Sequence, residues 1–309
     1  MLNFPEWLRI PLAEWVDVAM DWILDNLGPL FDWIGNVGLQ ILIAVERALL
    51  FLPWWVLVAV AGVVVWRLTR KWARGLGMAV MLFLVGVFGY WDGAMTTLSV
   101  VIVSVAVAIA IGIPMGIIMA WSDPVKRVIT PILDAMQTMP SFVYLIPALM
   151  LFGLGRVPAT FATLIYAIPP VIRLTDVGIR GVPGDTIEAA EAFGANRWSL
   201  LFDVQLPLAR PSIMVGINQT TMMALAMVVI GSMIGNRGLG MDVLLAINRV
   251  EIGKGFEAGL SIVFLAIVID RITHGLAEKR PVPIASGEQS ADKKKPDEAK
   301  EEKVAPKAG

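Results

Sequence analysis

The chain offers few side chains of the types that perform covalent or metal chemistry. Its 309 residues include no cysteine and a single histidine, His274, so the sequence excludes thiolate catalysis and disulfides and disfavours a histidine-based metal or acid–base centre. No H-E-x-x-H or G-x-S-x-G motif occurs. The only Gly-Lys pair, at residues 253–254, precedes a glycine and not the Ser or Thr of a phosphate-binding loop. The sequence therefore predicts no enzyme, no bound cofactor or metal, and no nucleic-acid partner.

One polar stretch, EAAEAFGANRWSLLFDVQLP at residues 188–207, instead predicts a docking element. It lies between apolar blocks, yet it carries strong helical signals. Asp185, followed three residues later by Glu188, has the spacing of a capping box that starts a helix. The alanines that follow make this helix thin, so it could lie deep in a groove of another protein. Gly194 then permits the left-handed turn that ends it.

A second helix is expected from Asn196 to the residue before Pro207. Within it, Trp198, Leu201 and Phe202 recur at helical spacing and would form an apolar face. Two amphipathic helices joined at a glycine predict a surface that binds a partner. A loop with a purely structural role is the alternative.

Further candidates are polar side chains inside apolar stretches, where they are costly unless they face a cavity or another helix. One set lies beside the proline at position 140 and consists of Gln137, Thr138, Ser141 and Tyr144. The other set is the run NQTT, which consists of Asn218, Gln219, Thr220 and Thr221. Four consecutive residues cover most of a helix circumference, so the second set cannot line one pore together. Hydrogen bonding between helices is an equal alternative for that set.

The elements that must position these residues are membrane-spanning helices. The chain is 57% hydrophobic with a mean hydropathy of +0.73, and about seven apolar stretches approach the ~20 residues that a crossing needs. They fall at residues 49–66, 75–90, 94–121, 132–153, 157–174, 211–235 and 256–274. Prolines at positions 140, 147, 169 and 170 should break the fourth and fifth stretches. The sequence predicts an all-α, polytopic membrane protein.

Basic residues predict the orientation of the spans. Four of them follow the first span, at positions 67, 70, 71 and 74, whereas the next loop has only Asp92. The positive-inside tendency then places the polar loop 183–207 and the C-terminus in the cytoplasm and the N-terminus outside. Residues 1–48 are predicted to form an amphipathic helical segment, 49–280 the transmembrane domain, and 281–309 a charged, disordered tail.

The docking stretch also resembles a known signature. Its pattern is Glu188-Ala189-Ala190, three residues, Gly194, nine residues, Val204, one residue and Leu206-Pro207. This pattern is similar to the EAA signature of ABC importer permeases, with a valine in place of the usual isoleucine. Longer stretches, such as AIPPVIRLT and QLPLARPSIMVGINQTTMMALAMVVIGSMIG, resemble the permease subunits of glycine betaine/proline betaine uptake systems, the ProW/OpuAB type. The resemblance covers residues 90 to 280.

This resemblance implies a type I ABC importer permease in the bacterial cytoplasmic (inner) membrane. Such a permease takes up a compatible solute, here glycine betaine or proline betaine, by alternating access. Its partners would be two separate ATPase subunits, which hold the ATP and Mg, a second copy of the permease, a periplasmic substrate-binding protein and the lipid bilayer. The signature residues would couple the ATPase to the membrane domain: Glu188, Ala189, Ala190, Gly194, Val204, Leu206 and Pro207.

Two alternatives stay open at this point. The same machinery could carry choline, carnitine or trimethylamine N-oxide, or the chain could be an osmotically gated channel. A quaternary ammonium solute favours aromatic faces, which adds Phe142 and Trp91 to Tyr144 as candidates for its path.

Overall fold

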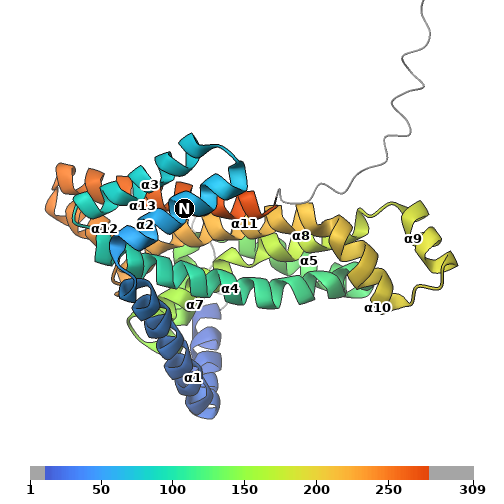
Figure 1. The fold of residues 1–309 in the computed structure, drawn as a ribbon. Helices are drawn as coiled ribbons and strands as arrows, with labels where there is room; N and C mark the ends of the chain where they lie inside the picture. Colours follow the sequence, from blue (N-terminus) through green and yellow to red (C-terminus); the bar gives the residue numbers. More distant parts are fainter. Residues whose placement is uncertain (1–10, 278–309) are drawn as a thin grey trace, which may run out of the picture. The chain divides into compact units, whose positions relative to one another are not determined.

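The computed structural model describes residues 11–277, and all regular secondary structure in that range is helical (Figure 1). The longer helices are α1 (Leu12–Phe51), α2 (Trp54–Thr69), α3 (Trp72–Val87), α4 (Trp91–Trp121), α5 (Asp123–Thr138), α7 (Arg156–Ala167), α8 (Pro169–Arg180), α11 (Leu206–Gly231), α12 (Leu239–Arg249) and α13 (Ile252–Ala277). Shorter segments join them: η2 (Ser141–Tyr144), α6 (Leu145–Phe152), α9 (Gly184–Ala192), α10 (Arg197–Ser199), η3 (Leu200–Gln205) and η4 (Ser232–Ile234). The prediction of an all-α fold is confirmed.

Several of these helices are long and apolar enough to cross a bilayer. Five continuous helices meet that criterion: Leu12–Phe51, Trp91–Trp121, Arg156–Arg180, Arg197–Ile234 and Ile252–Gly275. The pair α5 and η2–α6 meets it jointly, with a bend of 111° at the break. The hairpin of α2 and α3 consists of shorter apolar helices. The chain is therefore a multi-pass membrane protein.

The expected proline breaks explain the bend between α5 and α6. Pro140 follows the last turn of α5 and has no backbone N–H to continue it, so the chain turns there before η2 begins. At Ile168, directly before the Pro169–Pro170 pair, only the helix assignment is interrupted. Ile168 keeps helical backbone angles, and α7 and α8 continue as one span, so the predicted break of the fifth stretch is wrong. Pro147, in contrast, lies inside α6 and does not interrupt it.

The N-terminal part differs in extent from the expected segment 1–48. Residues 1–10 lie outside the described range, and α1 continues as one helix to Phe51. Because α1 itself meets the length and hydropathy criterion of a span, the number of crossings and the orientation of the chain stay predictions. The expected disordered tail, 281–309, also lies outside the described residues.

Contacts between helix ends sort the connections into two groups. Glu46 near the end of α1 pairs with Arg156 at the start of α7, and Leu239 N at the start of α12 donates to Thr97 in α4. At the other group of ends, Arg180 of α8 pairs with Asp123 at the start of α5. The helices α4 and α7–α8 each have one end in the first group and the other end in the second, as expected for crossings of one membrane.

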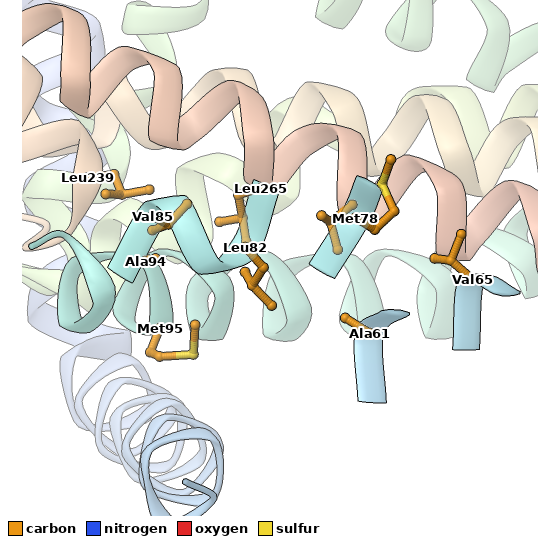
Figure 2. Packing of buried hydrophobic residues seen from close by; sticks show 10 residues of the cluster. Ala61, Val65, Met78, Leu82, Val85, Ala94, Met95, Leu239 and Leu265 are labelled. Carbon is orange, nitrogen blue, oxygen red and sulfur yellow. The ribbon is translucent and has the colours of Figure 1, made fainter. Parts of the chain in front are cut away.

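The largest buried cluster lies among α2, α3, α4, α12 and α13 (Figure 2). Val65 and Val85 in it have no exposed surface. The α2–α3 hairpin is tight because its helices meet at two glycines: a Cβ on Gly75 would lie 2.5 Å from the carbonyl oxygen of Gly62. This hairpin packs on α13 and forms one wall of the bundle.

Candidate functional site

The loop between α8 and α11 contains the signature residues and is the candidate functional site. In Figure 1, α9 and α10 lie together at one end of the helices, beyond α5 and α8. None of the residues of α9 is buried. Only Ile187 and Ala190 of this helix are half-buried and its other residues are exposed, so most of this short helix is surface.

The first helix of the loop begins differently from the predicted capping box. Pro183 occupies the N-cap position of α9, no side chain caps the helix, and the Pro183 carbonyl accepts from Thr186 N at 3.1 Å. The capping prediction for Asp185 and Glu188 is therefore wrong. Proline caps the helix two residues before the position that the sequence signal suggested. Asp185 lies instead within the first turn, where a carboxylate favours the positive end of the helix dipole.

The turn at Gly194 has the expected left-handed backbone, with φ of +88°. Gly194 N donates to Glu191 O at 2.9 Å and Ala195 N donates to Ala190 O at 3.0 Å. This pair of bonds is the Schellman motif, which satisfies the free carbonyls at a helix end. The space around an added Cβ is open, so the need for glycine is conformational and not steric.

The second helix begins at Asn196, as predicted. The Asn196 side chain accepts from Trp198 N at 3.0 Å and from Ser199 N at 2.9 Å, which is the usual bonding of an N-cap asparagine. Its predicted end before Pro207 is wrong, because the chain runs on without a break from Arg197 to Ile234.

A π-helical segment, η3, makes this continuity possible. It covers Leu200–Gln205, and α11 follows directly with Pro207 at its second residue. A helix needs no backbone N–H donor in its first turn, so the proline is tolerated where the wide π turns end. The helix that begins after Asn196 is thus continuous with α11, which contains most of the sixth expected span.

The apolar face expected on the second helix is divided between two roles. Leu201 is 1% exposed and packs with Ile179 of α8 and Ile213 of α11. Trp198 and Phe202 are 62% and 58% exposed and stack on each other at 6.0 Å. Leu201 therefore anchors the loop to the bundle and leaves two aromatic rings outside.

Phe193, in the turn, is 94% exposed and adds a third aromatic ring to this surface. Among the signature residues, Glu188, Ala189, Gly194 and Pro207 are exposed, and Ala190, Val204 and Leu206 are half-buried. Aromatic side chains left in water by a short helical loop are typical of a protein–protein contact. We call this surface, Gly184 to Phe202, the docking loop.

An ion-pair network at the base of the docking loop was not predicted from the sequence. Asp176 of α8 is 3% exposed and pairs with Lys126 of α5 at 2.7 Å and with Arg180 at 2.8 Å. Arg180 also pairs with Asp123 at 2.7 Å and donates to the Met119 carbonyl of α4 at 2.7 Å. The network fixes the end of α8, four residues before α9, to the α4–α5 connection.

The candidate path residues near the proline break have two different environments. Gln137 and Thr138 are exposed on α5. Tyr144 is 5% exposed and donates to Met136 O at 2.5 Å, across the break. The hydroxyl of Tyr144 thus stabilises the bend itself, whereas Gln137 and Thr138 remain open to a partner or a cavity.

The NQTT candidates face different sides of α11, as helix geometry requires. Asn218 donates to Asp270 of α13 at 3.1 Å and accepts from Thr273 at 2.8 Å. Gln219 is exposed, and Thr221 is buried with its hydroxyl on the Ile217 carbonyl. The contacts of Asn218 favour the alternative in which this residue joins two helices.

Tyr144 and Asn218, one residue from each set, lie at different levels of α11. Tyr144 clusters with Met227 and Ile234, and Met227 is about 13 Å farther along α11 than Asn218 by the rise of an α-helix. Tyr144 and Asn218 therefore do not meet in one polar pocket, and the role of the candidates in a solute path stays a prediction.

Comparison with known proteins agrees with this geometry. A family model described as "Binding-protein-dependent transport system inner membrane component" matches residues 112–279, which include the docking loop. The glycine betaine transport system permease protein OpuAB of Bacillus subtilis (strain 168) is 43% identical over 274 residues, or 88% of this chain and 96% of the relative.

Two further relatives have similar identities. The glycine betaine/proline betaine transport system permease protein ProW of Escherichia coli (strain K12) is 45% identical, covering 86% of this chain and 75% of the relative. The glycine betaine/carnitine transport permease protein GbuB of Listeria monocytogenes is 42% identical, and the match covers 90% of this chain and 99% of the relative. Among solved structures, a chain of the inward-facing MetNI methionine ABC transporter matches with a TM-score of 0.53 at 22% identity, over 59% of this chain and 91% of that one. This last likeness shows a shared fold.

Proposed function

Because the chain belongs to the family of inner membrane components of binding-protein-dependent transport systems, we propose that it forms the solute path of an ATP-driven importer for glycine betaine and related compatible solutes. The main relatives are permeases named for glycine betaine transport. The chain itself offers no phosphate-binding loop in its sequence. The energy for uptake must then come from a separate ATPase.

The docking loop is the observation that carries this proposal. It presents an exposed helix with small side chains and three exposed aromatic rings, and it is continuous with α11. A partner that grips the docking loop can therefore move a membrane-spanning helix directly. ATP and Mg would be bound by two ATPase subunits, one on the docking loop of each of two permease copies.

The mechanism we propose is alternating access. Closure of the ATPase pair on ATP would move both docking loops, and the helices would change from inward- to outward-facing. A ligand or partner shifts such an equilibrium only by its differential binding to the two states. The docking loop must hold the ATPase in both states, and the Asp176 network would keep α8 aligned with it.

Carnitine is the second candidate solute, because GbuB, a relative of nearly the same identity, is named for both glycine betaine and carnitine. Choline and trimethylamine N-oxide remain the further alternatives. Selectivity among them would be shared between the solute path and a separate periplasmic binding protein.

The test is uptake into proteoliposomes that contain the full-length chain, its ATPase and its binding protein. We expect accumulation of labelled glycine betaine that requires both internal ATP and external binding protein. Competition with carnitine, choline, proline betaine and trimethylamine N-oxide ranks the solutes. Flux of solute without ATP would identify a gated channel and overturn the proposal. Transport of carnitine but not of glycine betaine would show that carnitine is the solute.

A further inference from the structure

An apolar groove on the side of the bundle is not part of the docking loop, and of the candidate path residues only Thr221 borders it. It has a volume of about 500 Å³ and lies between α2, α3, α4, α11 and α13. Its rim is open to the outside of the bundle, because Val60 is 51% exposed and Ile102 is 41% exposed. Figure 2 shows four of its lining residues, Ala61, Leu82, Met95 and Leu265, which come from α2, α3, α4 and α13.

The groove lies at the level of the hydrocarbon. On α2 its lining runs from Leu57 to Val64. Exposed tryptophans flank that stretch on both sides, with Trp54 and Trp55 before it and Trp66 after it. Tryptophans are enriched at the two surfaces of a bilayer, so the lining between them faces acyl chains.

One end of the groove meets a cluster of cations. Arg67 lies three residues after Val64 and therefore continues the same face of α2. Arg70, Lys71 and Arg74 follow in the connection to α3 and its first turn, and all four cations are exposed. Within residues 11–277 no carboxylate pairs with any of them.

The end of α13 closes the same corner. A Cβ on Gly275 would lie 2.7 Å from Cβ of Leu68, so the two helix ends touch directly behind Arg67. The groove is therefore a cavity with an apolar body at membrane depth and four unpaired positive charges at one interface. That combination matches an amphiphile with a hydrocarbon chain and an anionic head.

We propose that this groove and the cations at positions 67, 70, 71 and 74 form a binding site for an anionic phospholipid. One acyl chain lies along the lining of α2, α4 and α13, and the headgroup phosphates lie among the guanidinium and ammonium groups, where charge-assisted hydrogen bonds are strong. A second copy on a twofold axis along the membrane normal would bring two sets of four cations together, which like-charge repulsion opposes.

Native mass spectrometry of the purified full-length chain tests this site with two probes, dioleoyl phosphatidylglycerol and dioleoyl phosphatidylcholine. The double variant Arg67→Gln/Lys71→Gln should bind phosphatidylglycerol about 30-fold more weakly, which corresponds to about 1 kcal/mol for each of the two charges. Phosphatidylcholine binding should not change. The matched control Arg237→Gln/Arg249→Gln removes two exposed cations elsewhere and should change neither.

A second variant probes the apolar part of the site. Ile102→Trp adds bulk at a partly exposed position of the groove rim and should weaken both lipids, because it occupies the space of the acyl chain. Unchanged phosphatidylglycerol binding in Arg67→Gln/Lys71→Gln, or equal loss in the control, would overturn the proposal. So would efficient cross-linking of two chains through Val60→Cys, since the groove would then hold a second copy.

Discussion

Gly194 is the residue on which the geometry of the docking loop depends most. Its φ of +88° is easily adopted by glycine and costs other L-residues about 1 kcal/mol or more. The Schellman bonds that close α9 need this conformation. A side chain at this position would loosen the turn that aims Phe193 and the signature helix.

We predict that Gly194→Asp abolishes most ATP-driven uptake while the protein still inserts and folds. An added Cβ meets no atom within 4 Å, so the change acts on the turn and on the docked partner, not on the core. Uptake and ATP hydrolysis are measured together in proteoliposomes. Gly184→Asp is the matched control, because Gly184 is equally open but has no positive φ. Normal coupling in Gly194→Asp would refute the role of the turn.

Glu188 gives a second prediction at the residue scale. Its side chain is exposed and does not cap its own helix, so Glu188→Lys should leave the melting temperature of the isolated chain unchanged. It should weaken recovery of the ATPase with the purified chain, because it reverses a charge on the docking surface. Glu251→Lys, far from the docking loop, serves as control. Equal ATPase recovery in wild type and Glu188→Lys would contradict this prediction.

At the scale of elements, the Asp176 network holds α8 to the α4–α5 connection. Removing one member of a buried ion pair leaves the charge of its partner uncompensated, which destabilises the fold. Because Lys126 and Arg180 are about one-third exposed, solvent screens part of that cost. We estimate a loss of about 2 kcal/mol for Asp176→Asn, between the values for buried and exposed pairs.

The measurement for Asp176→Asn is the melting temperature of the purified chain, which should fall by about 5 °C for a domain of this size. Asp134→Asn is the control: Asp134 also pairs with an arginine of α8, Arg173, but is 57% exposed in its side chain, and its loss should cost less than about 1 kcal/mol. Equal melting temperatures for the two variants would show that the network does not secure α8.

The elements also show what the sequence could and could not predict. Gly194 and Asn196 are local signals, because a turn or a cap is determined by the residue and its nearest neighbours. The capping box failed because Pro183 caps α9 two residues before the predicted cap, Asp185. The helix end at Pro207 failed because a π-helical segment admits the proline. The Asp176 network joins residues some fifty positions apart, and one sequence gives no signal for such a pairing.

At the scale of the whole molecule, the contacts between helix ends separate two groups of connections, and the distribution of basic residues predicts which group is cytoplasmic. Cysteine labelling of intact cells tests this, since the chain has no native cysteine. Asp92→Cys and Arg237→Cys should react with an impermeant thiol reagent from outside, and Arg197→Cys should react only after the membrane is opened. Labelling of Arg197→Cys in intact cells would reverse the orientation.

The central claim is that a separate ATPase binds the docking loop. Photo-cross-linking between position 193 and the ATPase tests this claim most directly. A photoreactive phenylalanine analogue at Phe193, which is 94% exposed, is compared with the same analogue at Phe256, which is 70% exposed and lies in the first turns of α13. In membranes that contain the assembled importer, we predict a cross-link from Phe193 to the ATPase both with and without ATP, and none from Phe256. Absence of the Phe193 cross-link in a complex that hydrolyses ATP and transports solute would contradict the account.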